Sequence, residues 1–555
     1  MGQSRLCRPR TSHHRCFRYH QPIPRGRIPG GERPLMTPRF SCATLLGVFA
    51  VSSLVLTATA LAPQTAFDSV SSAGLRDITS ERLRAHMAVL ADDAMEGRET
   101  GTRGFDRAAK YVADQFRALH LHAINGNYVQ SMTIRRARVN EGQTVLEITR
   151  QGRREPLVYG RDFVTYGVRG ETNVSVGGQI VFVGDGVTVP RDGIDAYRGS
   201  ETVGTIALAL PGAPASLSPS ERSYYGGADA KAANAAAHGV VALLLVEEAH
   251  IPWDLRVRAA RQLGVSEGLP TKMSPTVPIV YLNRSVAERI IGQPLESAAL
   301  QAGAATGIGS GKLAVRQAYR DVRSANVYAV WPGADPARAR EHVVVVAHLD
   351  HVGIGAPVNG DSIYNGAVDN ASGVAALLAM AKAFAEVPTR PARSVLFLAT
   401  TGEEQGEIGS EYFVRRPPIP VDSIIAAINV DGISVTAFEH LEISGGSNSS
   451  LGAIADAAAR RVELSVTHEP LGVGGSDHSP FLLAGIPALW IAATLTDEWM
   501  RTRYHTPQDD MRQPLDLAAA ARYTQFVFIT AYLAADALAR PMWNSGEFFG
   551  DRMAR

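Results

Sequence analysis

The sequence predicts an α/β protein with a mixed, mostly parallel sheet that is flanked by helices and interrupted by an inserted, β-rich module. Near-continuous apolar runs mark the buried strands: EHVVVVA, SVLFLAT, IIAAINV and IPALWIA. Helical patterns alternate with these runs, which is typical of parallel strands covered on both faces. Between residues 166 and 305 the pattern changes to short strands separated by Gly and Pro, which predicts the module.

Residues 78–120 predict two amphipathic helices joined by the loop AMEGRETGTR. The first, ITSERLRAHMAVLAD, has apolar residues at helical spacing, and Thr79 begins a plausible cap. The second, GFDRAAKYVADQFRALHL, repeats the spacing. Short alternating strands follow, among them TVLEI and DFVTYGV. We therefore assign residues 66–165 to the first part of the main domain.

The module at residues 166–305 predicts strands at GGQIVFVGDGV, GTIALALPG, GVVALLLVEEA and TVPIVYL, and a single helix at ADAKAANAAAHG. Charged catalytic candidates are scarce in it. From residue 306 to 545 the α/β pattern resumes, with a further strand at NVYAVWPG. Its predicted helices are SGVAALLAMAKAFAEV, GSEYFVRR, LGAIADAAARRV and DLAAAARYTQFVFITAYLAADAL.

Residues 36–62 have the layout of a secretory signal peptide. Arg39 precedes an apolar stretch at residues 43–56, and the small residues Ala-Leu-Ala at 60–62 form a cleavage site. A single membrane-anchoring helix is the alternative. The preceding 35 residues carry eight arginines and predict a non-structural extension. We expect a secreted or periplasmic protein without a stable membrane span after cleavage.

Composition narrows the classes of partner and metal site. Without residues 1–62 the chain has 46 basic and 53 acidic residues, a net charge of −7. This balance argues against a nucleic-acid partner, because phosphate binding needs basic patches. All three cysteines lie within residues 1–62, so the remainder forms no disulfide and no thiolate site. Any metal must be held by His, Asp and Glu.

Acids and histidines fall repeatedly at the carboxyl ends of the predicted strands, where ligands bind in open α/β sheets. Such residues follow VVVVA, VLFLATTG and AAIN, and the loops YNGAVDNASG and RTRYHTPQDD add more. The candidates in chain order are His348, Asp350, Asp369, Glu403, Glu404, Asp431, Tyr504 and His505. Their repetition at one edge of a sheet predicts a single polar site.

Five of these candidates have the donor atoms that suit zinc or a similar divalent ion. They are His348, Asp369, Glu404, Asp431 and His505. Five ligands are too many for one tetrahedral site, and they suit two ions if one carboxylate bridges. Two such ions clamp both sides of a hydrolytic displacement.

Two further carboxylates have roles beside these ligands. In the pattern His348-x-Asp350 the carboxylate is placed to orient the imidazole. Glu403 stands next to Glu404, and its side chain is free to take a proton from water and deliver it to a leaving amine.

The motifs together resemble those of the M28 family of di-zinc metallopeptidases, the bacterial aminopeptidase kind. They are HLDHVGIG…GDSIYNGAVDNASG, TTGEEQGEIGSEYF, NVDG, GSDHSPF and YHTPQDD. LADDAMEGRETGTRGFDRAAKYVADQF resembles the opening of secreted members, and GGADAKAANAAAHGVVALLLV resembles a protease-associated (PA) domain. The resemblance implies a zinc-peptidase (phosphorylase/hydrolase-like) fold with an inserted PA domain.

The resemblance also assigns two Zn²⁺ ions per chain. One ion goes to His348, Asp369 and Asp431. The other goes to Asp369, Glu404 and His505, so that Asp369 bridges the two.

The remaining roles follow from the same resemblance. Glu403 matches the general base, and Asp350 matches the residue that supports His348. Tyr504 matches a tyrosine that stabilises the tetrahedral oxyanion. The peptide bond after the bridging Asp369 is expected to be cis.

These assignments imply a secreted metallo-aminopeptidase that acts on peptides or proteins with a free N-terminus. The inserted domain is expected to shape or cover the cleft. A carboxypeptidase is an alternative, with Arg501 or Arg503 meeting the terminal carboxylate. A glutaminyl cyclase and a receptor-like binding protein are others, although the cyclases use one zinc and such receptors have lost ligands. A serine hydrolase has no support, because the chain lacks a GxSxG elbow.

Three polar residues near the motifs keep open roles. His351 is interpreted as pocket wall or as structural. Asp477 and His478, in GSDHSPF, are interpreted either as structural hydrogen-bonding residues or as substrate contacts.

Overall fold

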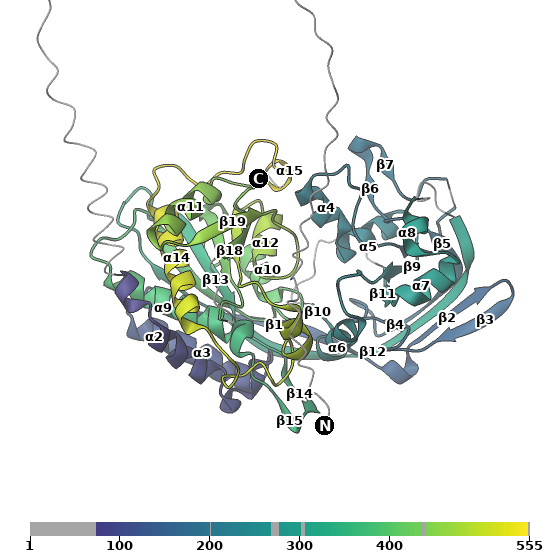
Figure 1. The fold of residues 1–555 in the computed structure, drawn as a ribbon, viewed down its shortest axis with the longest axis horizontal. Helices are drawn as coiled ribbons and strands as arrows, with labels where there is room; N and C mark the ends of the chain where they lie inside the picture. The colour runs from purple at the N-terminus through teal and green to yellow at the C-terminus, as the bar shows by residue number, and fades with distance from the viewer. Residues whose placement is uncertain (1–73, 200, 268–276, 301–305, 435–439, 553–555) are drawn as a thin grey trace, which may run out of the picture. The chain divides into compact units, whose positions relative to one another are not determined.

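The computed structural model describes residues 74–552 except 200, 268–276, 301–305 and 435–439 (Figure 1). Its large mixed sheet has parallel strands at the centre, with β13 between β16 and β17. β20 pairs parallel with β17, and β18 and β19 extend that side of the sheet. The strand bounds are β13 His342–His348, β16 Ser394–Thr400, β17 Ile424–Val430, β18 His440–Ser444, β19 Ser465–Glu469 and β20 Ala488–Ile491.

The four consecutive valines of β13 are fully buried and face two different cores. Val343 and Val345 pack with the helices on one face of the sheet. Val344 and Val346 pack into the core on the other face. Because side chains alternate along a strand, an uninterrupted apolar run fits a strand that is covered on both sides. The prediction of a mostly parallel sheet between helices is confirmed.

Helices cover both faces of this central sheet (Figure 1). The first face carries α2 Ser80–Leu90, α3 Arg103–Ala118, α9 Ser372–Glu386, α11 Leu451–Arg461 and α14 Leu517–Asp536. The second face carries α10 Ile408–Arg415, α12 His478–Leu483 and α15 Phe548–Arg552. The helix α13, Asp497–Thr502, precedes a loop of the polar site. The predicted cap is present, since the hydroxyl of Thr79 accepts a hydrogen bond from the backbone N–H of Arg82.

One long strand, β12 (Thr306–Trp331), belongs to two parts of the sheet. Its second half pairs antiparallel with β16, and its first half pairs antiparallel with β5. Beyond β5 the order continues through β8, β9 and β11 to β4. The bounds are β1 Val129–Val139, β2 Val145–Arg150, β3 Arg153–Leu157, β4 Phe163–Val164, β5 Asn173–Phe182, β8 Ile206–Ala209, β9 Ala242–Val246, β10 Val265–Glu267 and β11 Ile279–Leu282. The strands β5, β8, β9 and β11 therefore continue the same hydrogen-bonded sheet.

The prediction of a single helix between residues 166 and 305 is wrong. The predicted one is α5, Ala228–Ala237, and the others are α4 Pro219–Gly226, α6 Trp253–Gln262, α7 Arg284–Ile291 and α8 Leu295–Leu300. Each of these four is ten residues long or shorter, so few apolar positions reveal its period. Two small hairpins complete the described elements: β6 Thr188–Val189 with β7 Ile194–Asp195, and β14 Gly353–Val358 with β15 Asp361–Tyr364.

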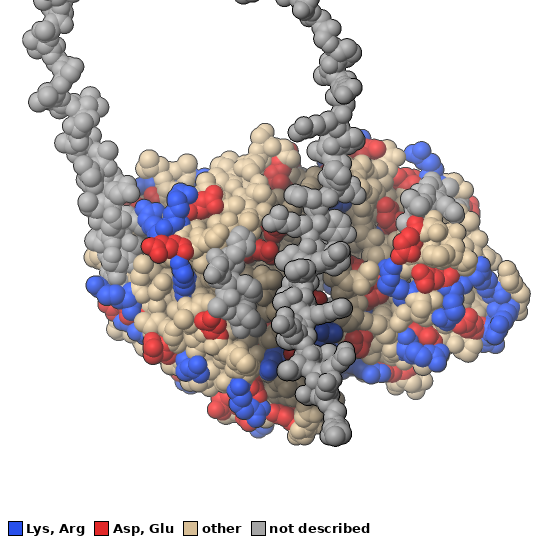
Figure 2. Space-filling view, viewed as in Figure 1, with Lys and Arg blue, Asp and Glu red and all other residues tan. Residues whose placement is uncertain are grey.

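The predicted signal peptide at residues 36–62 lies outside the described residues. Among the helices that the structure does describe, none has both the length and the apolar character needed to cross a membrane. Basic and acidic side chains are interspersed over the face seen in Figure 2.

Candidate metal centre

The predicted polar residues meet at the carboxyl ends of the parallel strands. β13 ends at His348, Glu403 and Glu404 follow β16, and Asp431 follows β17. The loop before α9 adds Asp369, and the loop after α13 adds Tyr504 and His505. The ligand side chains are buried or nearly so: His348 is 1% exposed and Asp431 15%.

Asp369 lies between two groups of possible metal ligands. Its Oδ1 is 3.3 Å from Nε2 of His348, and that nitrogen is 3.2 Å from Oδ1 of Asp431. Its Oδ2 is 3.3 Å from Nε2 of His505, which is 2.9 Å from Oε2 of Glu404. The two oxygens of one carboxylate thus serve opposite halves of the site, as a bridging ligand requires.

The structure adds His351 to the second group. Its Nδ1 lies 2.7 Å from Oε1 of Glu404 and 3.7 Å from Oδ2 of Asp369. One ligand atom from each of His351, Asp369, Glu404 and His505 lies within 4.8 Å of the others. The same holds for His348, Asp369 and Asp431.

Several donor atoms at the site lack a hydrogen-bond partner within the described chain, which is expected of atoms that bind a cation. Oε1 of Glu404 and both ring nitrogens of His351 and His505 are buried without a well-aligned hydrogen bond among the described residues. Buried polar atoms in proteins are almost always satisfied, and exceptions call for an explanation. Imidazole nitrogens and carboxylate oxygens are the donors that zinc takes in proteins without thiolate ligands.

Glu403 points its carboxylate into the same space, with Oε2 3.9 Å from Nε2 of His348. Burial raises the pKa of Glu403 well above its usual range, opposed by His348 and reinforced by Glu404 and Asp431. A carboxylate with a raised pKa accepts and returns a proton near neutral pH. For Asp369, burial would raise the pKa, but the surrounding histidines lower it well below its usual range.

Asp350 makes different contacts from those that the resemblance implies. Nδ1 of His348 is hydrogen bonded to the main-chain oxygen of Asp350, at 3.1 Å. Oδ1 of Asp350 accepts a hydrogen bond from the backbone N–H of Glu403, at 3.2 Å. Burial raises the pKa of Asp350 to about 6. Asp350 therefore orients the imidazole through its backbone and Glu403 through its side chain.

Tyr504 stacks on His505, with ring centroids 3.8 Å apart and an interplanar angle of 22°. Burial, together with the nearby carboxylates, raises the pKa of Tyr504 well above its usual value. The phenol therefore stays protonated and remains a hydrogen-bond donor beside the site.

The loop that carries Asp369 is fixed by residues that sequence reasoning did not single out. The Asp509 carboxylate accepts hydrogen bonds from the backbone N–H groups of Val368 and Asp369. Asn370 donates to the carbonyl oxygen of Val430, at the end of β17, so that it ties the two ligand segments together. The peptide bond between Asp369 and Asn370 is cis, as the resemblance implies. Asn370 and Asp509 both lie in motifs on which the resemblance rests, so these motifs were the signal that could have identified them.

Arg98 connects the two segments that carry His348 and Asp369 through hydrogen bonds to their backbone. Its guanidinium is fully buried and donates to the carbonyl oxygens of Leu349, Asn365 and Gly366, at 2.9, 2.5 and 2.9 Å. A further hydrogen bond goes to the carbonyl oxygen of Leu90 at the end of α2. Burial lowers the pKa of Arg98 to about 10, so it is still charged at neutral pH. In the sequence, Arg98 lies in the stretch EGRETG, which belongs to the N-terminal segment that resembles secreted members of the family and could have marked it.

Substituting Met for Arg98 should lower the free energy of unfolding of the metal-free protein by about 3–5 kcal/mol, because several buried carbonyls lose their partner. Urea unfolding of the metal-free protein measures the change. Arg103→Met is the control, since that side chain is 84% exposed and should change stability by less than about 0.5 kcal/mol. Equal stability of the two variants would contradict the role given to Arg98.

The geometry favours the structural reading of Asp477 and His478. The buried Asp477 carboxylate accepts hydrogen bonds from the hydroxyls of Thr400 and Ser410. The His478 ring stacks on Trp490 and is hydrogen bonded through Nε2 to the carbonyl oxygen of Gly472.

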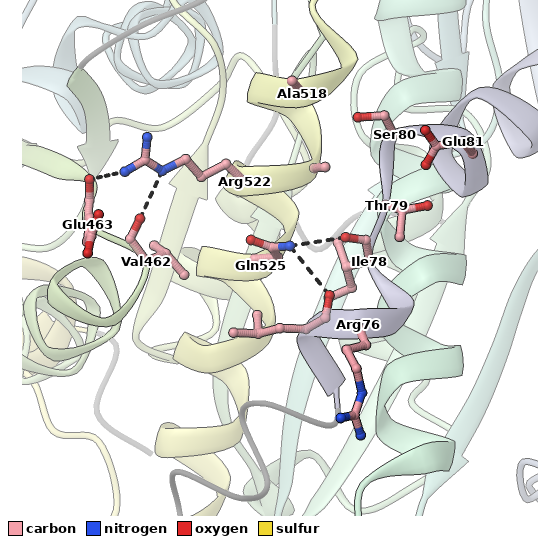
Figure 3. Close-up of a pocket in the computed structure, with 12 residues that line it drawn as sticks. Arg76, Ile78, Thr79, Ser80, Glu81, Val462, Glu463, Ala518, Arg522 and Gln525 are labelled. Atoms are coloured by element: carbon pink, nitrogen blue, oxygen red, sulfur yellow. Dashed lines mark hydrogen bonds between the residues drawn. The ribbon is translucent and has the colours of Figure 1, made fainter.

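A separate cavity of about 570 Å³ lies between the start of the described chain and α14 (Figure 3). Gln525 donates there to the carbonyl oxygens of Leu75 and Ile78, and Arg522 donates to that of Val462. None of the candidate metal ligands lines this cavity. Its polar groups fasten the N-terminal segment to α14.

Comparison with known proteins finds similarity to peptidases. The model of peptidase family M28 matches residues 326–530. Leupeptin-inactivating enzyme 1 of Streptomyces exfoliatus is 29% identical over 171 residues, which are 29% of this chain and 34% of that protein. Aminopeptidase YwaD of Bacillus subtilis (strain 168) is 29% identical over 198 residues, 33% of this chain and 40% of that protein. The chain thus matches about a third to two fifths of the length of these relatives.

The fold has a counterpart among solved structures. An aminopeptidase from Aneurinibacillus sp. strain AM-1 aligns with a TM-score of 0.54 at 20% identity, over 84% of this chain and 96% of that one. At this identity the likeness establishes the architecture. The match to the model of peptidase family M28 at residues 326–530 covers the part of the chain that carries the polar site.

Proposed function

We propose that the protein is an exported zinc aminopeptidase that removes N-terminal residues from peptides. The observation that carries the proposal is Asp369, whose two oxygens face the imidazoles of His348 and His505, each at 3.3 Å. The relatives named aminopeptidases support the activity. We propose that His348, Asp369 and Asp431 hold one ion, and that Asp369, Glu404 and His505 hold the other.

When bound, two zinc ions supply a lowered pKa for the attacking water and polarise the scissile carbonyl. In the proposed mechanism Glu403 takes the proton of that water and later passes it to the leaving amine. Its raised pKa makes this carboxylate a stronger proton acceptor than an ordinary one. The contact of Asp350 with the Glu403 backbone keeps the base in place.

We propose that Tyr504 donates a hydrogen bond to the oxyanion as it develops. A phenol with a raised pKa keeps its proton for this purpose. We propose that acidic groups around the site meet the amino group of a free N-terminus.

A carboxypeptidase would need a basic side chain to meet the terminal carboxylate. Arg501 donates to the carbonyl oxygen of Asp497, and Arg503 donates to that of Gln508. Arg98 is buried among backbone carbonyls. Because all three arginines donate to backbone carbonyl oxygens of the protein itself, we favour the aminopeptidase over the carboxypeptidase.

We further propose that residues 166–305 are a PA domain that limits the size of the substrate. Ser223 in α4 accepts a hydrogen bond from the backbone N–H of Val473, at 2.6 Å. Val473 lies in the loop that leads to Ser476, and Ser476 donates to Oδ2 of Asp431 at 2.7 Å. Unchanged cleavage of long peptides by a folded variant lacking residues 166–305 would contradict this role.

The test of the activity is hydrolysis of aminoacyl, N-blocked and C-terminal peptide substrates, with and without a chelator and zinc restoration. We expect release from free N-termini alone, lost on chelation, restored by zinc and absent in Glu403→Gln. No release from free N-termini by protein with two bound ions would overturn the aminopeptidase proposal. Release from free C-termini in that case would establish a carboxypeptidase.

A further inference from the structure

His351 is neither exposed nor placed as a simple wall of the site. It lies three residues beyond the end of β13, its side chain is fully buried, and its Nδ1 is 2.7 Å from Oε1 of Glu404. Neither Oε1 of Glu404 nor either ring nitrogen of His351 has a well-aligned hydrogen bond to a described residue. A nitrogen and a carboxylate oxygen at this distance are within the range of a charge-assisted hydrogen bond.

The two halves of the site have the same arrangement around their terminal carboxylates. Asp431 directs Oδ1 to His348, at 3.2 Å, while its Oδ2 accepts a hydrogen bond of 2.7 Å from the Ser476 hydroxyl. Glu404 directs Oε2 to His505, at 2.9 Å, while its Oε1 faces His351 at 2.7 Å. In each half one oxygen faces the metal site and the other faces a neighbouring polar group.

The backbone confines the His351 ring to this position. The N–H of His351 donates to the carbonyl oxygen of Arg98, at 3.3 Å. Gly366 passes so close to the ring that a Cβ at this residue would lie 2.5 Å from Cγ of His351. The space for the imidazole is therefore built from two segments, and one of them is the loop that carries Asp369.

We propose that His351 is a positioning residue for the ion held by Glu404 and His505. In the zinc-loaded protein its Nδ1–H would donate a hydrogen bond to Oε1 of Glu404, which lies 2.7 Å away, and this bond would turn Oε2 toward the ion. Partners of metal ligands fix ligand orientation, and their loss typically lowers metal affinity by about 10–100-fold. This inference rests on the proposed two-ion site.

The experiment is a zinc titration of the metal-free protein against a competing chelator, which resolves the affinity of each ion without any activity assay. In His351→Ala we expect one of the two affinities to fall about 10–100-fold and the other to stay unchanged. His351→Asn should restore it to within a few-fold, because the amide nitrogen of Asn, like Nδ1 of His, stands two bonds from Cβ. Ser476→Ala is the matched variant for the other half, and the double variant should weaken both ions.

The outcomes separate the inference from the function on which it rests. A His351→Ala protein that binds both ions with the original affinities overturns the inference. So does a His351→Asn protein as weak as His351→Ala, since that result requires direct ligation. If the unaltered protein binds fewer than two ions, the two-ion proposal fails whatever His351 does. Thermal unfolding of the metal-free variants confirms that a lost affinity does not come from a lost fold.

Discussion

Replacing Glu403 with Gln is expected to lower kcat by about 10²–10⁴-fold, because general acid–base catalysis contributes that much and the amide cannot accept the proton. The side chains have nearly the same shape, so the buried space around Glu403 and its backbone contact with Asp350 should be kept. Both zinc affinities should remain close to the original values, since Glu403 is not among the proposed ligands. The measurement is kcat on an aminoacyl substrate, together with the zinc content of the purified variant.

The substituted protein tests the role of the base separately from the presence of the metal. A variant with two ions and undiminished kcat would rule out Glu403 as the base. A variant that has lost its zinc would show that Glu403 acts as a ligand, contrary to the proposed division between Glu403 and Glu404.

Replacing Asp369 with Ala is expected to remove both ions at concentrations of zinc that saturate the original protein. Each proposed ion takes one of the two Asp369 oxygens, so a single substitution breaks both sets of ligands. Activity should fall by at least about 10⁴-fold, because water without a bound cation keeps a pKa near 15.7. Zinc content by mass spectrometry of the native protein measures the stoichiometry, and the aminopeptidase assay measures the rate.

Asp431→Ala is the matched control, because it lies on one side of the bridge only. We expect it to lose one ion and keep the other, with His351, Asp369, Glu404 and His505 still in place. If Asp369→Ala also keeps one ion at full affinity, Asp369 is a ligand of a single ion and the bridge does not exist.

Local patterns predicted the elements and the ends of the strands. The valines of β13 gave a buried strand, and its last residue, His348, gave the first polar group of the site. Parallel strands bring their carboxyl ends together, so Glu404 and Asp431 were expected beside it. The helices α4, α6, α7 and α8 were not predicted, because six to ten residues contain too few turns to show a helical period.

Contacts between distant segments could not be predicted in the same way. Arg98 donates to carbonyl oxygens that lie 251 to 268 positions further along the chain, and no pattern in either segment reports that pairing. The Asp350 carboxylate was expected to orient His348, yet it accepts a hydrogen bond from the backbone N–H of Glu403, because that choice depends on the placement of two neighbouring strand ends. The sequence left His351 open as pocket wall or as structural, because no local pattern shows that its ring faces Glu404.

The hydrogen bonds of Arg98 also constrain the order in which the protein acquires its ions. Closing such long stretches of chain is slow, since contacts between distant residues are made only after a large loss of chain entropy. The ligand loops are held in place only when α2, β13 and the segment before α9 have already met. We therefore expect zinc to bind a chain whose ligand loops Arg98 already joins, in contrast to small domains whose folding depends on the metal.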